Sequence, residues 1–132
     1  MKILVVDDEV ISRKKLLAIL GKYAECEMAS SGEQALEMFQ KSLDAGAPYK
    51  LITMDVLMPG ISGKETVEKI RKIEADRGIN SMDDSVKILM ISASDDGKTI
   101  FTSFRKGCEA YLVKPFDADS ILQKLDEMSC YF

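Results

Sequence analysis

The feature that most constrains the fold of this chain is the alternation of short apolar runs with longer amphipathic segments. Four runs are almost continuously apolar, as expected for strands that are covered on both faces. They are Ile3–Val6, Leu51–Met54, Val86–Ile91 and Ala110–Val113, and a weaker candidate lies around Cys26–Ala29. The chain therefore offers the strands of a buried sheet.

A segment with helical spacing of its apolar residues follows each of these runs. These segments are Val10–Leu20, Ala35–Leu43, Val67–Ile73, Gly97–Lys106 and Ile121–Met128. Ser30 with Glu33, and Ser62 with Glu65, form the capping-box pattern that marks a helix start. Strand and helix thus alternate five times, which favours a parallel sheet with helices on both faces. We predict an α/β, doubly wound fold in a single domain, residues 1–132.

Charge and hydropathy exclude two classes of partner. The chain has 22 acidic and 18 basic residues and a net charge of -4. General nucleic-acid binders carry a basic patch or stripe, so we expect no direct contact with nucleic acid. No apolar run approaches the roughly 18 to 20 residues of a membrane span, so we expect no membrane association.

The cysteines and the absence of histidine limit the chemistry further. Cys26, Cys108 and Cys130 are far apart and form no Cys-x-x-Cys pair, which argues against a disulfide framework and a cysteine zinc site. Free thiols fit a reducing, cytoplasmic location, which we expect for this chain. Without histidine there is no Ser-His-Asp triad, and carboxylates, hydroxyls and lysines must carry any chemistry.

Polar residues follow four of the expected strands at the point where each strand ends. Asp7 and Asp8 follow the first, Asp55 the third, Ser92 the fourth and Lys114 the fifth. Each has an ordinary explanation when taken alone: a helix cap, a turn residue, a helix start or a solvated charge. Together they lie where open α/β sheets bind ligands, at the carboxyl ends of the strands.

Such a cluster suits phosphoryl transfer. Carboxylates about 4 Å apart repel by about 4 kcal/mol per pair at an effective dielectric near 20, so they need a counter-charge. All-oxygen ligands favour Mg²⁺, which also accepts phosphate oxygens, and Lys114 adds a positive charge. A carboxylate that attacks phosphorus would form an acyl phosphate.

At these residues the sequence resembles a response-regulator receiver domain, the family of the chemotaxis regulator, over about residues 2 to 128. The motifs are Ile3-Leu4-Val5-Val6-Asp7-Asp8, Met54-Asp55-Val56-Leu57-Met58-Pro59-Gly60, Ile91-Ser92-Ala93 and Tyr111-Leu112-Val113-Lys114-Pro115-Phe116. The resemblance implies a flavodoxin-like (βα)5 fold with strand order 2-1-3-4-5. It also implies a cis peptide bond between Lys114 and Pro115.

The resemblance implies a role for each matching residue. Asp55 would be the phosphoacceptor, and Asp7, Asp8, Asp55 and the backbone carbonyl of Leu57 would bind Mg²⁺. Ser92 would be the switch hydroxyl and Lys114 the cation that contacts the phosphate.

An aromatic residue completes the implied switch, because Tyr111 matches the family's switch aromatic. We expect its ring to turn inward after phosphorylation. The chain would be a phosphoacceptor that assists its own phosphorylation and dephosphorylation, and not an enzyme with a separate substrate.

The implied partners are a histidine kinase or phosphotransfer protein and a downstream protein target. The target would bind the face formed by the fourth helix, the fifth strand and the fifth helix. In the fourth helix, we expect the apolar residues Ile100, Phe101 and Phe104 to be core residues and not a partner-binding patch. If one of the three faces outward, we expect it to be Ile100. Leu57 is apolar where the family tunes dephosphorylation, so it offers no hydrogen bond to an attacking water.

Other functions fit the sequence less well. A haloacid-dehalogenase-like phosphatase needs an Asp-x-Asp motif, whereas Asp7 is followed by Asp8 and Glu9. A flavodoxin-like electron carrier needs a Ser-, Thr- and Gly-rich loop where this chain has acids. A receiver module that binds partners without phosphorylation is the remaining alternative.

Overall fold

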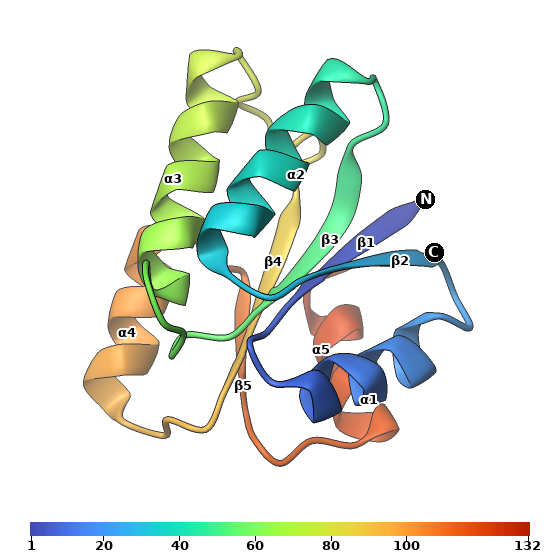
Figure 1. Cartoon of the computed structure of the whole chain (residues 1–132), viewed down its shortest axis with the longest axis vertical. Coiled ribbons are helices and arrows are strands. Elements are labelled where there is room, and N and C mark those ends of the chain that lie inside the picture. The colour runs from blue at the N-terminus through green and yellow to red at the C-terminus, as the bar shows by residue number, and fades with distance from the viewer.

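Five parallel strands alternate with five helices, in a computed structural model that describes residues 1–132 (Figure 1). The strands are β1 (Lys2–Val6), β2 (Glu25–Ala29), β3 (Tyr49–Met54), β4 (Lys87–Ser92) and β5 (Ala110–Val113). The helices are α1 (Val10–Leu20), α2 (Gly32–Asp44), α3 (Gly63–Asp76), α4 (Gly97–Lys106) and α5 (Ala118–Glu127). The sheet order is β2-β1-β3-β4-β5, so the predicted fold and strand order are confirmed, including the weak strand around Cys26.

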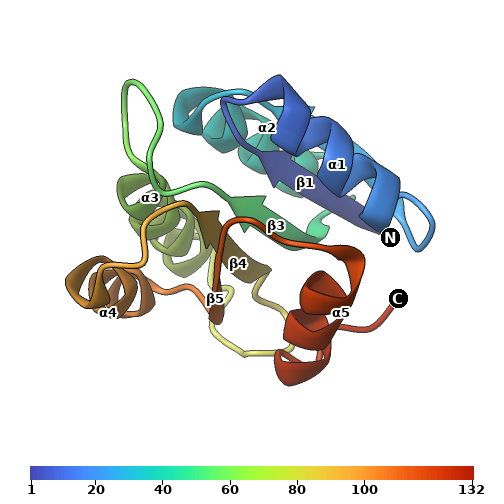
Figure 2. The same cartoon turned by 90° about the horizontal axis from the view of Figure 1, so that it is seen from below.

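The helices form two layers that cover both faces of the sheet. Figure 2 shows the sheet between α1 and α5 on one side and α2, α3 and α4 on the other. Because successive strand residues point to opposite faces, Ile3 and Val5 pack toward the first layer and Leu4 and Val6 toward the second. None of the five helices has the length and apolar character needed to cross a membrane.

Helix α2 begins one residue later than its capping pattern predicts. Ser31, and not Ser30, is the N-cap, and its hydroxyl accepts from the Gln34 N–H at 3.1 Å. The Gln34 side chain in turn accepts from the Ser30 N–H at 2.8 Å. Helix α3 begins as predicted, because the Ser62 hydroxyl accepts from the Glu65 N–H at 3.2 Å.

The orientation of α4 differs from our expectation. Phe101 and Phe104 are 62% and 45% exposed, whereas Ile100 packs against the core between the sheet and α2, α3 and α4. The buried position on this helix belongs to Ser103, whose hydroxyl donates to the Thr99 carbonyl at 2.8 Å and is thereby satisfied. The prediction that the two phenylalanines are core residues and that Ile100 faces outward is therefore wrong.

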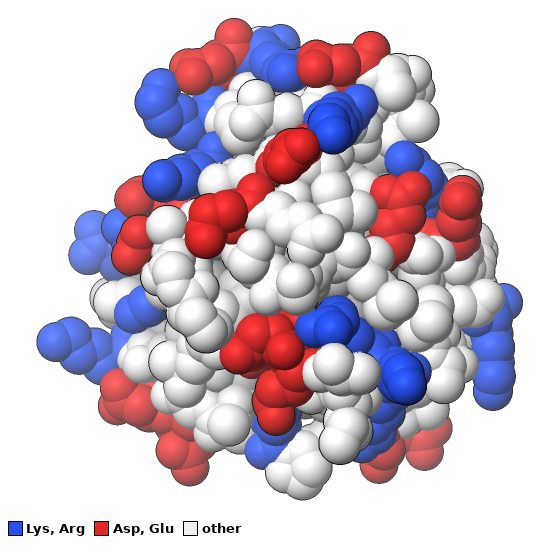
Figure 3. All heavy atoms as spheres, viewed as in Figure 1, with Lys and Arg blue, Asp and Glu red and all other residues white.

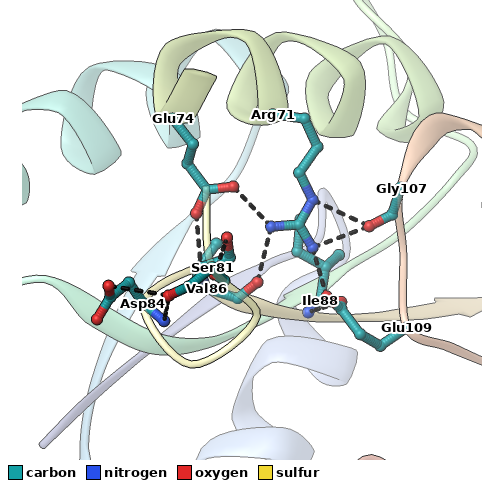
Figure 4. Close-up of polar contacts among 9 residues, drawn as sticks. Arg71, Glu74, Ser81, Asp84, Val86, Ile88, Gly107 and Glu109 are labelled. Carbon is teal, nitrogen blue, oxygen red and sulfur yellow. Dashed lines mark hydrogen bonds and ion pairs between the residues drawn. The ribbon is translucent and has the colours of Figure 1, made fainter. Parts of the chain in front are cut away.

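Arg71 joins three segments of the chain (Figure 4). They meet at the end of the sheet opposite to Asp7 and Asp55, which follow β1 and β3. Its guanidinium donates to the Gly107 carbonyl at 2.8 and 3.0 Å and to the Val86 carbonyl at 2.8 Å. It also pairs with Glu74 at 2.7 Å and Glu109 at 2.6 Å. This cluster ties α3 to the start of β4 and to the turn between α4 and β5.

The two acids of the cluster are satisfied on their other side as well. Glu74 accepts from the Val86 N–H at 2.8 Å, and Glu109 accepts from the Ile88 N–H at 2.6 Å. Burial raises the pKa of Glu109, and the positive charge of Arg71 opposes that rise. The carboxylates are thus compensated by one shared cation.

Thr53 on β3 differs from these paired polar groups, because its buried hydroxyl has no hydrogen-bond partner. We expect Thr53→Val to raise the free energy of unfolding by about 1 kcal/mol, since it removes an unpaired polar group from the core. Thr66→Val is the matched control, because the equally buried Thr66 hydroxyl donates to the Ser62 carbonyl at 2.8 Å and its loss should destabilise. Urea denaturation of both variants measures this, and a less stable Thr53→Val protein would contradict it.

Candidate functional site

Three carboxylates meet at the carboxyl end of the sheet. Oxygen atoms of Asp7, Asp8 and Asp55 all lie within 4.8 Å of one another. Asp7 and Asp55 are buried, and Asp8 is exposed. Figure 3 shows acidic side chains gathered over the region where β1 runs into α1 in Figure 1. The sequence-predicted acids therefore form one cluster that is open to solvent on one side.

The sheet itself holds the two buried acids in place. The Asp7 N–H donates to the Ala29 carbonyl at 3.2 Å, and the Asp55 N–H donates to the Val6 carbonyl at 3.0 Å. These bonds extend the parallel ladders one residue beyond the strands. At the start of α3, a Cβ on Gly63 would lie 2.0 Å from the Asp55 carbonyl oxygen. Only glycine lets the helix approach the acid so closely.

Lys114 supplies the positive charge of the cluster. Its Nζ lies 2.9 Å from Asp7 Oδ2, 3.1 Å from Glu9 Oε1 and 3.3 Å from Asp55 Oδ2. Burial acts to lower the pKa of Lys114, but the bond to Asp7 and the charge of Asp55 outweigh it, so the pKa is raised. The lysine is therefore a fixed cation, suited to neutralise an anion beside Asp55.

Opposing effects also act on the pKa of Asp55, but here burial outweighs the others. Burial raises the pKa of its carboxyl, against the hydrogen bond from the Leu57 N–H and the charge of Lys114. The Leu57 N–H donates to Asp55 Oδ1 at 3.1 Å, while the Leu57 side chain is 61% exposed. The acid is thus desolvated on one side and oriented by two donors on the other.

Glu9 is the one acid of the cluster that the sequence reasoning missed. Its N–H donates to Asp7 Oδ1 at 2.9 Å, and its carboxylate is the third partner of Lys114. The run Asp7-Asp8-Glu9 contains this acid, but Glu9 does not directly follow a strand, so the position that indicated the other acids did not indicate it.

The donor set fits a hard divalent cation. It consists of carboxylate oxygens from three acids, with no thiol or imidazole among them, and Mg²⁺ prefers such oxygen ligands and retains several waters. The exposed side of the cluster leaves room for those waters. Asp7, Asp8 and Asp55 could hold Mg²⁺, and the carbonyl of Leu57 lies in the adjoining loop.

Ser92 and Tyr111 are linked through one residue. The fully buried Ser92 hydroxyl accepts from the Ser94 N–H at 3.3 Å. The Tyr111 hydroxyl donates to the Ser94 carbonyl at 2.8 Å, and the Tyr111 residue is only 7% exposed. The Tyr111 ring therefore lies inward, and its hydroxyl is bonded to the loop that follows β4.

The peptide bond between Lys114 and Pro115 is cis, as the sequence resemblance implies. The Lys114 N–H donates to the Ser92 carbonyl at 2.8 Å, so β4 and β5 remain paired up to the site.

Comparison with known proteins identifies the family. Residues 3–126 match the model of the response regulator receiver domain. The chemotaxis protein CheY of Listeria monocytogenes is 30% identical over 127 residues, which cover 96% of this chain and 97% of that protein.

Two solved structures have the same fold over nearly the whole chain. One is the receiver domain of Saccharomyces cerevisiae Ssk1, crystallised with the histidine phosphotransfer protein Ypd1; its TM-score is 0.84 at 27% identity, covering 98% of this chain and 89% of that one. The other is TrrA of Thermotoga maritima in complex with Mg²⁺ and BeF, with a TM-score of 0.74 at 32% identity, covering 96% and 97%. The chain belongs to the response regulator receiver domain family of two-component signalling.

Proposed function

We propose that this chain is a two-component phosphorelay response regulator that accepts a phosphoryl group on Asp55 with Mg²⁺. The observation that carries the proposal is the contact of the buried Asp55 carboxylate with Lys114 inside a cluster of three acids. Receiver domains are signalling phosphoacceptors, so the proposal assigns no separate substrate to the chain.

The reaction follows from the arrangement of the side chains. A carboxylate oxygen of Asp55 attacks the phosphorus of the donor and forms an O–P bond, while the donor's N–P or O–P bond breaks and the leaving group departs with its electron pair. Lys114, now bonded to Asp55 and Asp7, turns one N–H to a phosphoryl oxygen. Bound Mg²⁺ would supply further positive charge for the acids and the phosphoryl oxygens.

Labelling of the native chain tests this assignment. Incubation with Mg²⁺ and a small acyl-phosphate donor should add one phosphoryl group that hydroxylamine removes, because an acyl phosphate is labile to that nucleophile. Peptide mapping should place it on the peptide that contains Asp55. A hydroxylamine-stable group, or one on another peptide, would contradict the proposal.

Asp8 should be necessary for Mg²⁺ binding. We expect Asp8→Ala to weaken the affinity for Mg²⁺ by at least about 10-fold, because it removes one of three carboxylate ligands. Asp83→Ala, an exposed acid in the loop between α3 and β4, is the control. Isothermal titration with Mg²⁺ alone measures both, and an unchanged affinity in Asp8→Ala would refute the metal site.

Exposed apolar side chains near the acids offer a surface for the phosphodonor. Val10 is 52% exposed, Ile11 82% and Leu57 61%. They come from the start of α1 and from the loop after β3, the two segments that carry the acids. We infer that a histidine kinase or phosphotransfer protein contacts this surface, and the solved complex of the Ssk1 receiver domain with Ypd1 supports a partner of this kind.

The contacts of Ser94 suggest how phosphorylation reaches the target-binding face. If Ser92 donates to a phosphoryl oxygen, its hydroxyl rotates and its bond from the Ser94 N–H changes. Tyr111 is bonded to the same residue through the Ser94 carbonyl. The loop before α4 would therefore move with Ser92, and with it α4 and its exposed Phe101 and Phe104, which we propose as the part of the α4–β5–α5 face that binds the downstream target.

Ser92→Ala should break this relay without preventing phosphorylation. We expect the phosphorylated native chain to show changed amide shifts at Ser94 and Tyr111 in an NMR spectrum, and the phosphorylated Ser92→Ala chain to show much smaller ones. The substitution removes the hydroxyl, which is the only hydrogen-bond donor in the Ser92 side chain. Equal shifts in both chains would show that Ser92 is not the relay.

A receiver module that acts by phosphorylation-independent protein binding remains the second candidate. The exposed Phe101 and Phe104 of α4 would serve this candidate too, because a partner can bind two exposed aromatic rings whether or not Asp55 carries a phosphoryl group. A target that binds native and Asp55→Asn chains equally, with or without an acyl-phosphate donor, would favour this candidate.

A further inference from the structure

The loop between β3 and α3 is fixed at both ends. At its start, the Leu57 N–H donates to Asp55 Oδ1 at 3.1 Å, and at its end the Gly63 N–H donates to the Val56 carbonyl at 2.9 Å. Its middle is exposed at Pro59 and Gly60. The loop follows Asp55 directly and contains Leu57, whose carbonyl is a proposed Mg²⁺ ligand.

A side chain from α2 holds this exposed middle. Glu33 Oε1 accepts from the Ile61 N–H at 3.1 Å. Apart from Asp55, Glu33 is the only residue whose side chain hydrogen-bonds a backbone N–H between Leu57 and Ile61. Glu33 is therefore the side chain outside the loop and β3 that bonds the exposed part of the loop to α2.

The loop is shaped to receive this carboxylate. Gly60 has a φ of +79°, and a Cβ at this position would lie 2.7 Å from Glu33 Oε2. A residue with a side chain would be strained by this φ and would crowd the carboxylate. The backbone of Gly60 and the N–H of Ile61 thus lie in close contact with the Glu33 carboxylate.

Electrostatics favour the same contact. Glu33 lies in the first turn of α2, and Ile61 directly precedes Ser62, the N-cap of α3. The negative carboxylate is therefore next to the amino ends of two helices, where a negative charge is stabilised. The contact joins α2 and α3 at the end of the sheet that carries the acids.

We propose that Glu33 is a positioning residue that holds the β3–α3 loop and, through it, the Leu57 carbonyl in place for Mg²⁺. This inference rests on the proposed function, because it concerns the same site. Residues that orient metal ligands from outside the coordination shell commonly change metal affinity by about 10- to 100-fold when they are removed.

Three variants separate the hydrogen bond from the charge and from helix stability. Glu33→Ala removes the acceptor, and Glu33→Gln keeps an acceptor oxygen for Ile61 without the charge. Glu37→Ala is the control, since Glu37 lies one turn further along α2, is exposed, and pairs only with Lys41 at 3.0 Å. The measurements are NMR titration with Mg²⁺ alone and hydrogen exchange of the Ile61 amide.

We expect Glu33→Ala to weaken Mg²⁺ affinity by about 10-fold and to speed exchange at Ile61. The Glu33→Gln and Glu37→Ala chains should have nearly the Mg²⁺ affinity and the Ile61 exchange rate of the native chain. Native affinity and exchange in Glu33→Ala would overturn the proposal, as would a Glu33→Gln chain that behaves like Glu33→Ala. If native chain took no phosphoryl group at Asp55, the proposed function would fail, while exchange at Ile61 would still decide whether Glu33 holds the loop.

Discussion

Asp55→Asn is expected to abolish phosphorylation of this chain by a small acyl-phosphate donor. The amide side chain has nearly the shape of the carboxylate, but it lacks the nucleophilic oxygen that would form the acyl phosphate. Intact-mass spectrometry after incubation with Mg²⁺ and the donor measures the result. The native chain should gain one phosphoryl group, and the variant none.

Asp95→Asn is the matched control, because Asp95 is an exposed acid in the loop before α4 that makes no hydrogen bond or ion pair through its side chain. It should be labelled like the native chain. Full labelling of Asp55→Asn would mean that another group accepts the phosphoryl group, and the assignment of Asp55 would then be wrong.

Arg71→Ala is expected to cause the largest loss of stability, about 3 to 5 kcal/mol in the free energy of unfolding. The substitution removes the cation that Glu74 and Glu109 share (Figure 4), and it leaves two carboxylates whose side chains are only 4% and 25% exposed. It also removes the donors to the Gly107 and Val86 carbonyls. Urea denaturation followed by circular dichroism measures the change.

Lys72→Ala provides the comparison on the next residue of α3. Lys72 and Asp76 form an exposed pair at 3.1 Å, and such pairs contribute about 0 to 1 kcal/mol. If Arg71→Ala were destabilised no more than Lys72→Ala, the cluster around Arg71 would not be a main tie between α3, β4 and β5.

The strands and the acid cluster could be predicted from the sequence because each depends on local pattern. Runs such as Ile3–Val6 are apolar on both faces of the sheet, and the acids follow directly where the runs end. Parallel strands bring their carboxyl ends to one edge, so Asp7 and Asp55 meet there. The strand order came from the family resemblance, because periodicity alone does not fix which strands are neighbours.

The orientation of α4 could not be predicted in this way. Ile100, Phe101 and Phe104 are all apolar, and a helix can bury either Ile100 or the two phenylalanines. The choice depends on the small Ser103, which occupies the buried face because its hydroxyl bonds within the helix. This arrangement leaves two large aromatic side chains exposed for a partner.

Two contacts between residues distant in the sequence were also beyond prediction. Glu9 meets Lys114 across 105 residues, and Glu33 meets Ile61 across 28. The sequence places Glu33 in a capping pattern and Glu9 at the end of an acidic run, but neither pattern shows which distant residue the side chain meets. Only the folded arrangement shows that they hold groups of the candidate site.

The most direct test of the account is the Mg²⁺ dependence of phosphorylation in the native chain. Intact-mass spectrometry should follow incubation with a small acyl-phosphate donor, once with Mg²⁺ and once with an excess of chelator. The account predicts one phosphoryl group on the chain with Mg²⁺ and almost none with the chelator. No labelling with Mg²⁺, or equal labelling in both conditions, would contradict it.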